Sequence, residues 1–375
     1  MKRCIFLIID GLGDLPVAAL NGLTPLEAAQ TPNFDRLAST GYFGLVDPIK
    51  AGIIPNTDSG TGLLMGMLPS EVDKLRRGTI EAAGVGRVLQ EGEVALRANF
   101  ATAVTGSEPL LVQDRRAGRA RHGLEEMAGE LHGMDLGDGL RAEFIITEQH
   151  RAVLVLAGGK LDARVSDTDP GDAVLPAPLQ WSKAMTREAG PCARALNRFI
   201  RASHEILRDH PLNSIRGGQG KKPANMIITR GAGSAVDVQN QFSAHGVSAA
   251  VISGCNTVRG LGRMLGFELV DHPAFTADLD TDLDGKIQAA LETLNWHNLA
   301  FVQIKAADVC AHDRDASAKR DFIERIDGAI LPLLEHDVLV ALASDHTTDS
   351  NTGHHSGDPV PAFISAGNAA APGTL

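Results

Sequence analysis

Short apolar runs that end in an acidic residue recur along the chain and predict its main strands. Residues 4–10 (CIFLIID) form one such run, and residues 297–308 (HNLAFVQIKAAD) and 337–346 (DVLVALASDH) repeat the pattern. A continuous apolar run of this length is typical of a strand buried in a parallel sheet. Because the carboxyl ends of parallel strands meet at one edge, we expect the terminal acids to converge there.

The segments between these runs favour helices. Residues 24–41 carry a helix-like pattern bounded by Pro and Gly, and residues 316–334 place their charges on one side of a helical spacing. A strand is expected near residues 43–46, before the polar turn of residues 54–62. Strands that alternate with helices predict an α/β protein with a largely parallel sheet.

The middle of the chain has a different pattern. Residues 93–104, 142–158 and 222–233 are strand candidates, separated by Gly-rich and charged segments. We therefore predict a smaller α/β domain of residues 86–235, inserted into a first domain that comprises residues 1–85 and 236–375. The Gly-, Ala- and Pro-rich end after Ala366 is expected to be frayed.

Composition narrows the classes of function. The 375 residues are 43% hydrophobic and 22% charged, with a formal net charge of -11, which argues against nucleic acid as the main partner. Small anionic substrates remain compatible, because local Arg clusters and metal ions can outweigh the net charge. The four scattered cysteines favour a reducing cytoplasm, and the apolar run that begins at Cys4 is too short to span a membrane.

Asp and His recur at spacings that suit metal ligation. Asp308 and His312 stand four residues apart, so on one helical turn they would face the same way. The other candidates lie at expected strand ends or in the HHSGDPVP segment: Asp10, Asp345, His346 and His355. Singly, such residues more often cap helices or form surface pairs. Together, carboxylate and imidazole ligands suit Zn, Mn, Fe or Co, and Asp-rich sites accept Mg.

The segment NTDSGTG, residues 56–62, places hydroxyl groups in a Gly-containing turn before an apolar run. A turn of this kind usually provides a helix N-cap. Its backbone N–H groups could also bind a phosphate, and a hydroxyl held by a metal becomes a usable nucleophile.

These motifs in combination resemble one enzyme family. IIDGLGD, NTDSG, RRGTIEAAGVG, LRANFAT, DRRAGR, HRAV with SDTDP, IKAADVCAHD, SDHTT and HSGDPVP occur in the order typical of archaeal-type cofactor-independent phosphoglycerate mutases. The resemblance spans nearly the whole chain. It implies an alkaline phosphatase-like fold, with a largely parallel sheet flanked by helices and an inserted smaller α/β domain.

The resemblance also implies a two-metal site that moves a phosphoryl group from phosphoglycerate to the enzyme and back. Asp10, Thr57, Asp345 and His346 would hold one ion, and Asp308, His312 and His355 the other. Mn is the expected metal, with Mg, Zn or Co as alternatives, and no 2,3-bisphosphoglycerate is required. Two ions would neutralise the charge that develops during transfer.

The nucleophile segment departs from the family pattern. Alignment of NTDSG on that segment puts Thr57 where the family usually has Ser, and Ser59 is the rival candidate. Thr carries the same hydroxyl group, so phosphoryl transfer remains compatible with the change.

The inserted domain is expected to supply cationic contacts to the substrate. The resemblance places six residues in segments that face it: Asp114, Arg115, Arg119, His150, Arg151 and Arg230. The alternative for any single Arg is a surface ion pair.

The expected reaction is interconversion of 3-phosphoglycerate and 2-phosphoglycerate, with a small phosphorylated substrate and neither nucleic acid nor membrane as partner. Rival functions are a phosphatase, a phosphodiesterase, a phosphonate-cleaving hydrolase or a homoserine kinase-like phosphotransferase of the same superfamily. A metal-binding structural protein is disfavoured, because structural sites usually close their coordination sphere. The sequence leaves the oligomeric state open.

Overall fold

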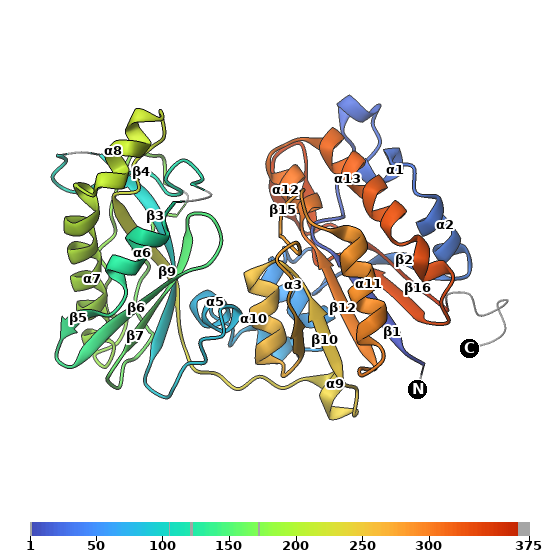
Figure 1. Ribbon diagram of the computed structural model, residues 1–375, viewed down its shortest axis with the longest axis horizontal. Helices are drawn as coiled ribbons and strands as arrows, with labels where there is room; N and C mark the ends of the chain where they lie inside the picture. Colours follow the sequence, from blue (N-terminus) through green and yellow to red (C-terminus); the bar gives the residue numbers. More distant parts are fainter. Residues whose placement is uncertain (1, 105, 121–122, 172, 367–375) are drawn as a thin grey trace. The chain divides into compact units, whose positions relative to one another are not determined.

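The chain folds into two compact units in the computed structural model, which describes residues 2–104, 106–120, 123–171 and 173–366. The first unit comprises Met1–Asp73 and Val238–Leu375, and the second comprises Lys74–Asp237 (Figure 1). Each unit has its own hydrophobic core. The end expected to be frayed, after Ala366, lies outside the described residues.

The first unit is built on a seven-stranded sheet in the order β11-β10-β12-β1-β13-β16-β2. Strand β1 pairs in parallel with β12 and β13, and β10 pairs in parallel with β12 and β11, whereas β16 and β2 are antiparallel. The bounds are β1 (Cys4–Ile9), β2 (Gly41–Val46), β10 (Ala249–Ile252), β11 (Glu268–Val270), β12 (Leu299–Ile304), β13 (Leu339–Ala343) and β16 (Val360–Ser365). The expected α/β fold with a largely parallel sheet is confirmed.

Helices pack on both faces of this sheet. Successive side chains of a strand point to opposite faces, so apolar strands such as these expose apolar groups on both sides that must be covered. Ile5, Leu7 and Ile9 share a core cluster with side chains of α2, α11 and α13. On the other face the Phe6 and Phe301 rings lie 5.7 Å apart, and α10 contacts β10 and β11. The helices are α1 (Pro25–Ala28), α2 (Pro32–Ser39), α3 (Thr57–Leu64), α4 (Pro69–Val72), α9 (Gln241–Ala244), α10 (Asn256–Met264), α11 (Leu283–Thr293), α12 (Ala306–His312) and α13 (Ala316–Ala329), with short 3-10 turns at Ala18–Leu20 and Leu331–Leu334.

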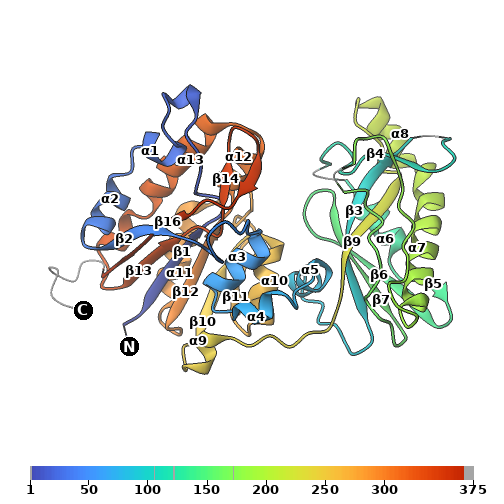
Figure 2. The ribbon, with the colours of Figure 1, turned by 180° about the vertical axis from the view of Figure 1, so that it is seen from behind.

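A small hairpin follows β13. It consists of β14 (Thr347–Asp349) and β15 (His354–Ser356), paired antiparallel so that Thr348 lies opposite His355. Figure 2 shows the hairpin, labelled at β14, at the same end of the sheet as α12. This end is the carboxyl end of the parallel strands, where the sequence predicts the acids to converge.

The second unit has an antiparallel sheet in the order β5-β6-β7-β3-β4-β8, and β9 also pairs with β3. Helices α6 and α7 pack on one face of it and α5 on the other. The bounds are β3 (Val94–Ala103), β4 (Leu111–Asp114), β5 (Met134–Gly137), β6 (Leu140–Ile146), β7 (Arg151–Ala157), β8 (Ala177–Pro178), β9 (Met226–Ser234), α5 (Arg77–Gly84), α6 (Glu125–Leu131), α7 (Gly190–Arg208) and α8 (Pro211–Gly218).

Two details of this unit differ from the sequence-based expectation. The apolar stretch 142–158, expected as one strand, is broken between β6 and β7, which pair with each other antiparallel. Gln149, at the break, has a φ of 53°, in the region that turns favour. The helix α5 belongs to the second unit, because it packs on β3 and β9, whereas the expected boundary at residue 86 left it in the first.

The helices of the described chain include none that is long and apolar enough to cross a membrane.

Helix α3 approaches the end of β13 so closely that only glycine fits at the contact. A Cβ atom on Gly60 would lie 2.1 Å from the Asp345 carbonyl oxygen, whereas one on Gly328, in α13, would meet no atom within 4 Å. We predict that Gly60→Ala lowers the thermal unfolding midpoint, at a cost of about 1–3 kcal/mol from overpacking. Gly328→Ala is the matched control and should leave the midpoint equal or higher, because Ala favours helix by up to about 1 kcal/mol. Equal midpoints for the two variants would contradict the close contact.

Candidate active site

Three parallel neighbours in the first sheet each deliver one buried carboxylate to the same edge. Asp10 follows β1, Asp345 follows β13, and Asp308 lies in α12, directly after β12. Their side chains are almost fully buried, at 0–2% exposure. The topology brings Asp10 together with two acids from the last fifth of the chain.

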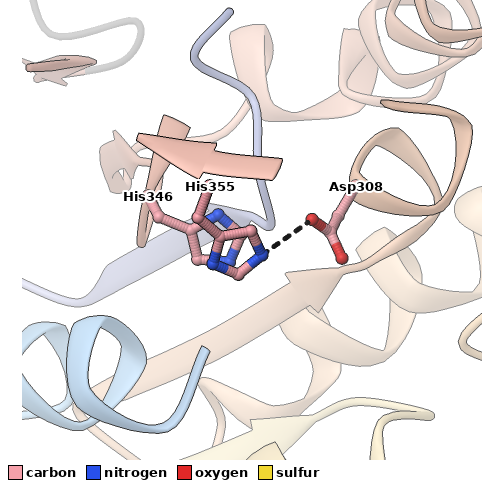
Figure 3. Close-up of side chains that lie close together, drawn as sticks. All are labelled: Asp308, His346 and His355. Atoms are coloured by element: carbon pink, nitrogen blue, oxygen red, sulfur yellow. Dashed lines mark ion pairs between the residues drawn. The ribbon is translucent and has the colours of Figure 1, made fainter. Parts of the chain in front are cut away.

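Three imidazoles meet these carboxylates. His346 Nε2 lies 3.3 Å from Asp10 Oδ1 and 3.5 Å from Asp345 Oδ2. Asp308 Oδ1 lies 3.3 Å from His312 Nε2 and 3.6 Å from His355 Nε2. Figure 3 shows the Asp308–His355 pair beside the stacked rings of His346 and His355, whose centroids are 3.7 Å apart.

Each of these imidazoles is anchored through its other nitrogen. His312 Nδ1 lies 2.8 Å from the Gly353 carbonyl oxygen, and His355 Nδ1 lies 3.0 Å from that of Pro55. His346 Nδ1 lies 3.0 Å from the hydroxyl of Thr348, which itself donates to Asp308 Oδ1 at 2.8 Å. These acceptors place a proton on every Nδ1, so each Nε2 is available as a ligand when its ring is neutral.

Lys305 and Gln303 hold the outer oxygens of two carboxylates. Lys305 Nζ lies 3.0 Å from Asp10 Oδ2 and 2.8 Å from Asp308 Oδ2. Gln303 Nε2 donates to Asp10 Oδ2 at 2.8 Å, and its Oε1 accepts from Ser253 at 2.7 Å. Asp10 Oδ1 is buried and makes no hydrogen bond within the described part of the chain. Asp10 is thus fixed through Oδ2, whereas Asp308 is held through both oxygens, by Lys305 and by Thr348.

The electrostatics of the cluster reflect the crowding of buried charges. Burial first, and then the nearby Asp10, raise the pKa of Asp345 to about 6. Burial alone would lower the pKa of His346, but Asp345 and Asp10 raise it to about 9. For Asp308, burial opposes ionisation, yet Lys305 and the imidazoles hold its pKa well below the usual range. Such strong perturbation is typical of a functional site.

Thr57 places a hydroxyl group at this cluster. It is the first residue of α3, is 8% exposed, and its Oγ1 lies 3.4 Å from His346 Nε2. One turn further along α3, Thr61 Oγ1 donates to Asp345 Oδ2 at 3.1 Å. Ser59 is occupied by capping, because its Oγ donates to the Asn56 carbonyl oxygen and accepts from the Asn56 amide.

The second unit gathers arginines on the α5 face of its sheet. Arg97 and Asn99 alternate along β3 with the core residues Leu96 and Ala98, so both point to the opposite face. Asn99 pairs with Arg151, and Arg97 pairs with Arg230. The neighbouring charges of the cluster also include Arg77, Arg115 and Arg116.

The residues expected to contact the substrate lie in or beside this cluster. Arg115 binds Asp169 through Nε and Nη2, the latter at 2.7 Å, and Arg151 binds Glu148 at 3.1 Å. Asp114 accepts from Lys222 Nζ at 2.6 Å and from the Arg116 amide at 2.8 Å. Arg119 has a left-handed φ of 55° and lowers the pKa of its neighbour Arg116, after burial.

His150 is a neutral member of this group. It is 3% exposed, and burial, followed by the charges of Arg151, Arg97 and Arg116, lowers its pKa to about 3. Its carbonyl oxygen accepts from the Phe100 amide at 2.8 Å, and its Nδ1 makes no hydrogen bond to a described residue. An imidazole in this state can offer a hydrogen bond to a ligand but no positive charge.

Comparison with known proteins identifies the family. A family model described as 2,3-bisphosphoglycerate-independent phosphoglycerate mutase matches residues 38–213. A 2,3-bisphosphoglycerate-independent phosphoglycerate mutase of Methanopyrus kandleri is 42% identical over 373 residues, which cover 97% of this chain and 88% of the relative. The chain belongs to the 2,3-bisphosphoglycerate-independent phosphoglycerate mutase family. The resemblance drawn from the motifs is confirmed.

Further relatives agree with this membership. Phosphoglycerate mutase 1 of Methanothermobacter thermautotrophicus is 39% identical over 365 residues, covering 96% of this chain and 88% of its own. Among solved structures, the PH0037 protein from Pyrococcus horikoshii superposes with a TM-score of 0.79 at 30% identity, covering 97% of this chain and 87% of that one. The cofactor-independent phosphoglycerate mutase of Thermoplasma acidophilum gives a TM-score of 0.64 at 30% identity, with 98% and 90% covered.

Sequence reasoning missed several residues that the structure places at these sites. Lys305, Gln303 and Thr348 contact the candidate ligands, and Arg97 lies at the centre of the arginine cluster. For Gln303 and Arg97 the signal was a polar side chain inside a largely apolar strand. Lys305, directly after β12, was visible only as part of the IKAAD motif.

A third group of potential ligands does not fit a metal. Glu126, Glu130 and His210 lie close enough together to hold an ion. His210 Nδ1 accepts a hydrogen bond from the Leu212 amide at 3.2 Å, so its Nε2 carries the proton and donates to Glu130 at 3.3 Å. A neutral imidazole in this tautomer has no lone pair left for a metal.

We predict that His150 stays neutral across the physiological range. With a pKa of about 3, it remains unprotonated at every pH well above that value. Its imidazole proton chemical shifts should therefore stay constant between about pH 5 and pH 8, whereas an exposed histidine titrates near 6.5. A His150 titration step above pH 5 would show that the surrounding arginines do not control it.

Proposed function

We propose that this chain interconverts 3-phosphoglycerate and 2-phosphoglycerate through a phosphoenzyme at Thr57, with two bound divalent ions. The observation that carries the proposal is the convergence of three anchored imidazoles and three buried carboxylates beside one buried hydroxyl group. Family membership supplies the substrate class, because the relatives are named as phosphoglycerate mutases that do not depend on 2,3-bisphosphoglycerate.

The residues present fit two metal ions. Asp10, Asp345, His346 and Thr57 would hold one ion. Asp10 Oδ1 faces His346 Nε2 at 3.3 Å but accepts no hydrogen bond from a described residue, so it is available as a ligand atom. Asp308, His312 and His355, whose ligand atoms lie within 3.6 Å of one another, would hold the other. When bound, such ions neutralise charge on a transferring phosphoryl group and favour the ionised form of a bound hydroxyl. Mn is the proposed metal, since mixed carboxylate and imidazole ligands suit it.

Thr57 is the proposed nucleophile rather than Ser59. Its hydroxyl faces His346, whereas the Ser59 hydroxyl is committed to Asn56 at the start of the helix. In the first half-reaction a bond forms between Thr57 Oγ1 and phosphorus while the bond from phosphorus to the 3-oxygen of the substrate breaks. The hydroxyl proton leaves Thr57 and the released 3-oxygen gains one; the second half-reaction reverses these steps at the 2-oxygen.

The arginine cluster of the second unit is the proposed holder of the glycerate. Arg guanidinium groups bind carboxylate and phosphate at two points each, and the six expected residues, Asp114, Arg115, Arg119, His150, Arg151 and Arg230, lie in or beside the cluster. Retention of the glycerate would distinguish a mutase from a phosphatase, because it lets the phosphoryl group return before water attacks.

The decisive measurement follows both products from one substrate. We predict that metal-loaded protein, supplied with 3-phosphoglycerate and without 2,3-bisphosphoglycerate, forms 2-phosphoglycerate with little free phosphate. Thr57→Val should lower turnover by at least about a thousandfold and prevent labelling by substrate phosphate, whereas Ser59→Ala should retain both. Release of phosphate alone would replace the mutase with a hydrolase, and labelling of Ser59 would reassign the nucleophile.

A second prediction concerns the metal. Chelation should abolish turnover, and Asp345→Ala or His312→Ala should reduce the metal retained per chain, because each removes a ligand from one proposed set. His336→Ala is the control, since that exposed histidine belongs to neither proposed ligand set and its Nδ1 lies 2.8 Å from the Pro332 carbonyl oxygen. Metal content is read by elemental analysis, independently of activity. Full turnover in verified metal-free protein would refute the two-ion site.

A further inference from the structure

The last strand of the first sheet leaves a row of apolar side chains exposed. Strand β2 pairs with β16 on one edge and is terminal in the strand order of the described residues. Exposure is 64% for Tyr42, 76% for Phe43, 69% for Leu45 and 43% for Val46. These residues are consecutive apart from Gly44, so large apolar groups are exposed on both faces of the strand.

The strand also carries none of the features that usually protect a sheet edge. Natural edges are interrupted by charged residues, proline or bulges, which prevent pairing with another chain. The residues of β2, GYFGLV, include no charge and no proline, and its register with β16 runs without a bulge from Gly41 to Val46. An edge of this kind is suited to the addition of another strand.

We propose that two copies of this chain associate through antiparallel pairing of β2 with β2 about a two-fold axis. A two-fold axis perpendicular to a sheet keeps each side chain on its own face, so one residue must lie opposite its own copy, with the axis between the two. With Gly44 on the axis, Tyr42 lies opposite Val46 of the second copy, and Phe43 lies opposite its Leu45. Pairs of an aromatic with a β-branched or aliphatic residue stabilise antiparallel strands.

This register explains the sequence of the strand better than solvent exposure does. Every large apolar side chain from Tyr42 to Val46 gains an apolar partner, and the glycine occupies the position where the two backbones face each other. Gly44 has open space around it, since a Cβ atom there would meet nothing within 4 Å. Packing within one copy therefore does not require a glycine at position 44.

The net negative charge of the chain also favours association through an uncharged surface such as β2. With a formal net charge of -11, two copies repel each other over distances up to the Debye length of about 8 Å at physiological salt. Association then depends on a surface without added like charge, which β2 provides. Closed two-fold dimers are the commonest symmetric assemblies and need only one such patch.

Cysteine cross-linking tests the register. Directly opposite residues of antiparallel strands have Cα atoms about 4.5–5.5 Å apart, within the range of about 4.4–6.8 Å that a disulfide spans. Gly44→Cys should therefore form a disulfide between copies under a mild thiol oxidant. Tyr42→Cys is the matched control, because the two copies of residue 42 would lie about 14 Å apart along the strands. We expect Gly44→Cys to cross-link at least tenfold faster; equal rates would overturn the register.

Light scattering after size-exclusion chromatography tests the association itself. The wild-type protein and Gly44→Ala should elute as dimers, and Gly44→Lys should elute as a monomer because two ammonium groups would meet on the axis. A monomeric wild-type protein would overturn the proposal, as would a Gly44→Lys variant that remains a dimer. None of these readouts depends on the proposed enzymatic function.

Discussion

The burial of three carboxylates within a few ångströms of one another is the constraint on which the first unit depends. Ionised groups in a protein interior are costly unless they are paired, and like charges at this distance oppose one another. The fold compensates with Lys305, which contacts Asp10 and Asp308 together, and with imidazoles that face the remaining oxygens. Three carboxylates still face one lysine here, so the site is well suited to further cations.

The same constraint accounts for the glycines and hydroxyl groups around the cluster. The Gly11 amide donates to Asp345 Oδ1, and Thr61 donates to its Oδ2, so backbone and helix approach the acid directly. A side chain at Gly60 would prevent this approach. The second unit has the opposite charge balance, because its buried Arg97 is surrounded by other cations. Glu81, 3.6 Å from Arg97, supplies only part of the compensation, which makes this face of the sheet receptive to anions.

Much of this arrangement could be predicted from the sequence, because it follows from local pattern. The strands that precede Asp10, Asp308 and Asp345 were visible as apolar runs, and parallel strands necessarily share a carboxyl edge. The position of His355 could be inferred only from family resemblance, since it depends on how the β14–β15 hairpin folds back. The roles of Lys305 and Gln303 depend on contacts between distant segments, which no period in the sequence reveals. The neutral state of His150 likewise follows from its three-dimensional surroundings rather than from its residue type.

The short hairpin β14–β15 has a consequence for how the cluster tolerates change. It follows directly after His346 and carries His355, and its register places His355 opposite Thr348, the residue that anchors His346. Successive residues of a strand point to opposite sides, so a slip of one position would turn the His355 ring away and set another side chain against the His346 ring. An insertion or deletion of a single residue between Thr347 and Ser356 would therefore displace His355 and disturb the anchor of His346, so both proposed ligand sets would be affected at once. Loops of this length usually vary in length, but the length of this hairpin is fixed by the register that places His355 opposite Thr348.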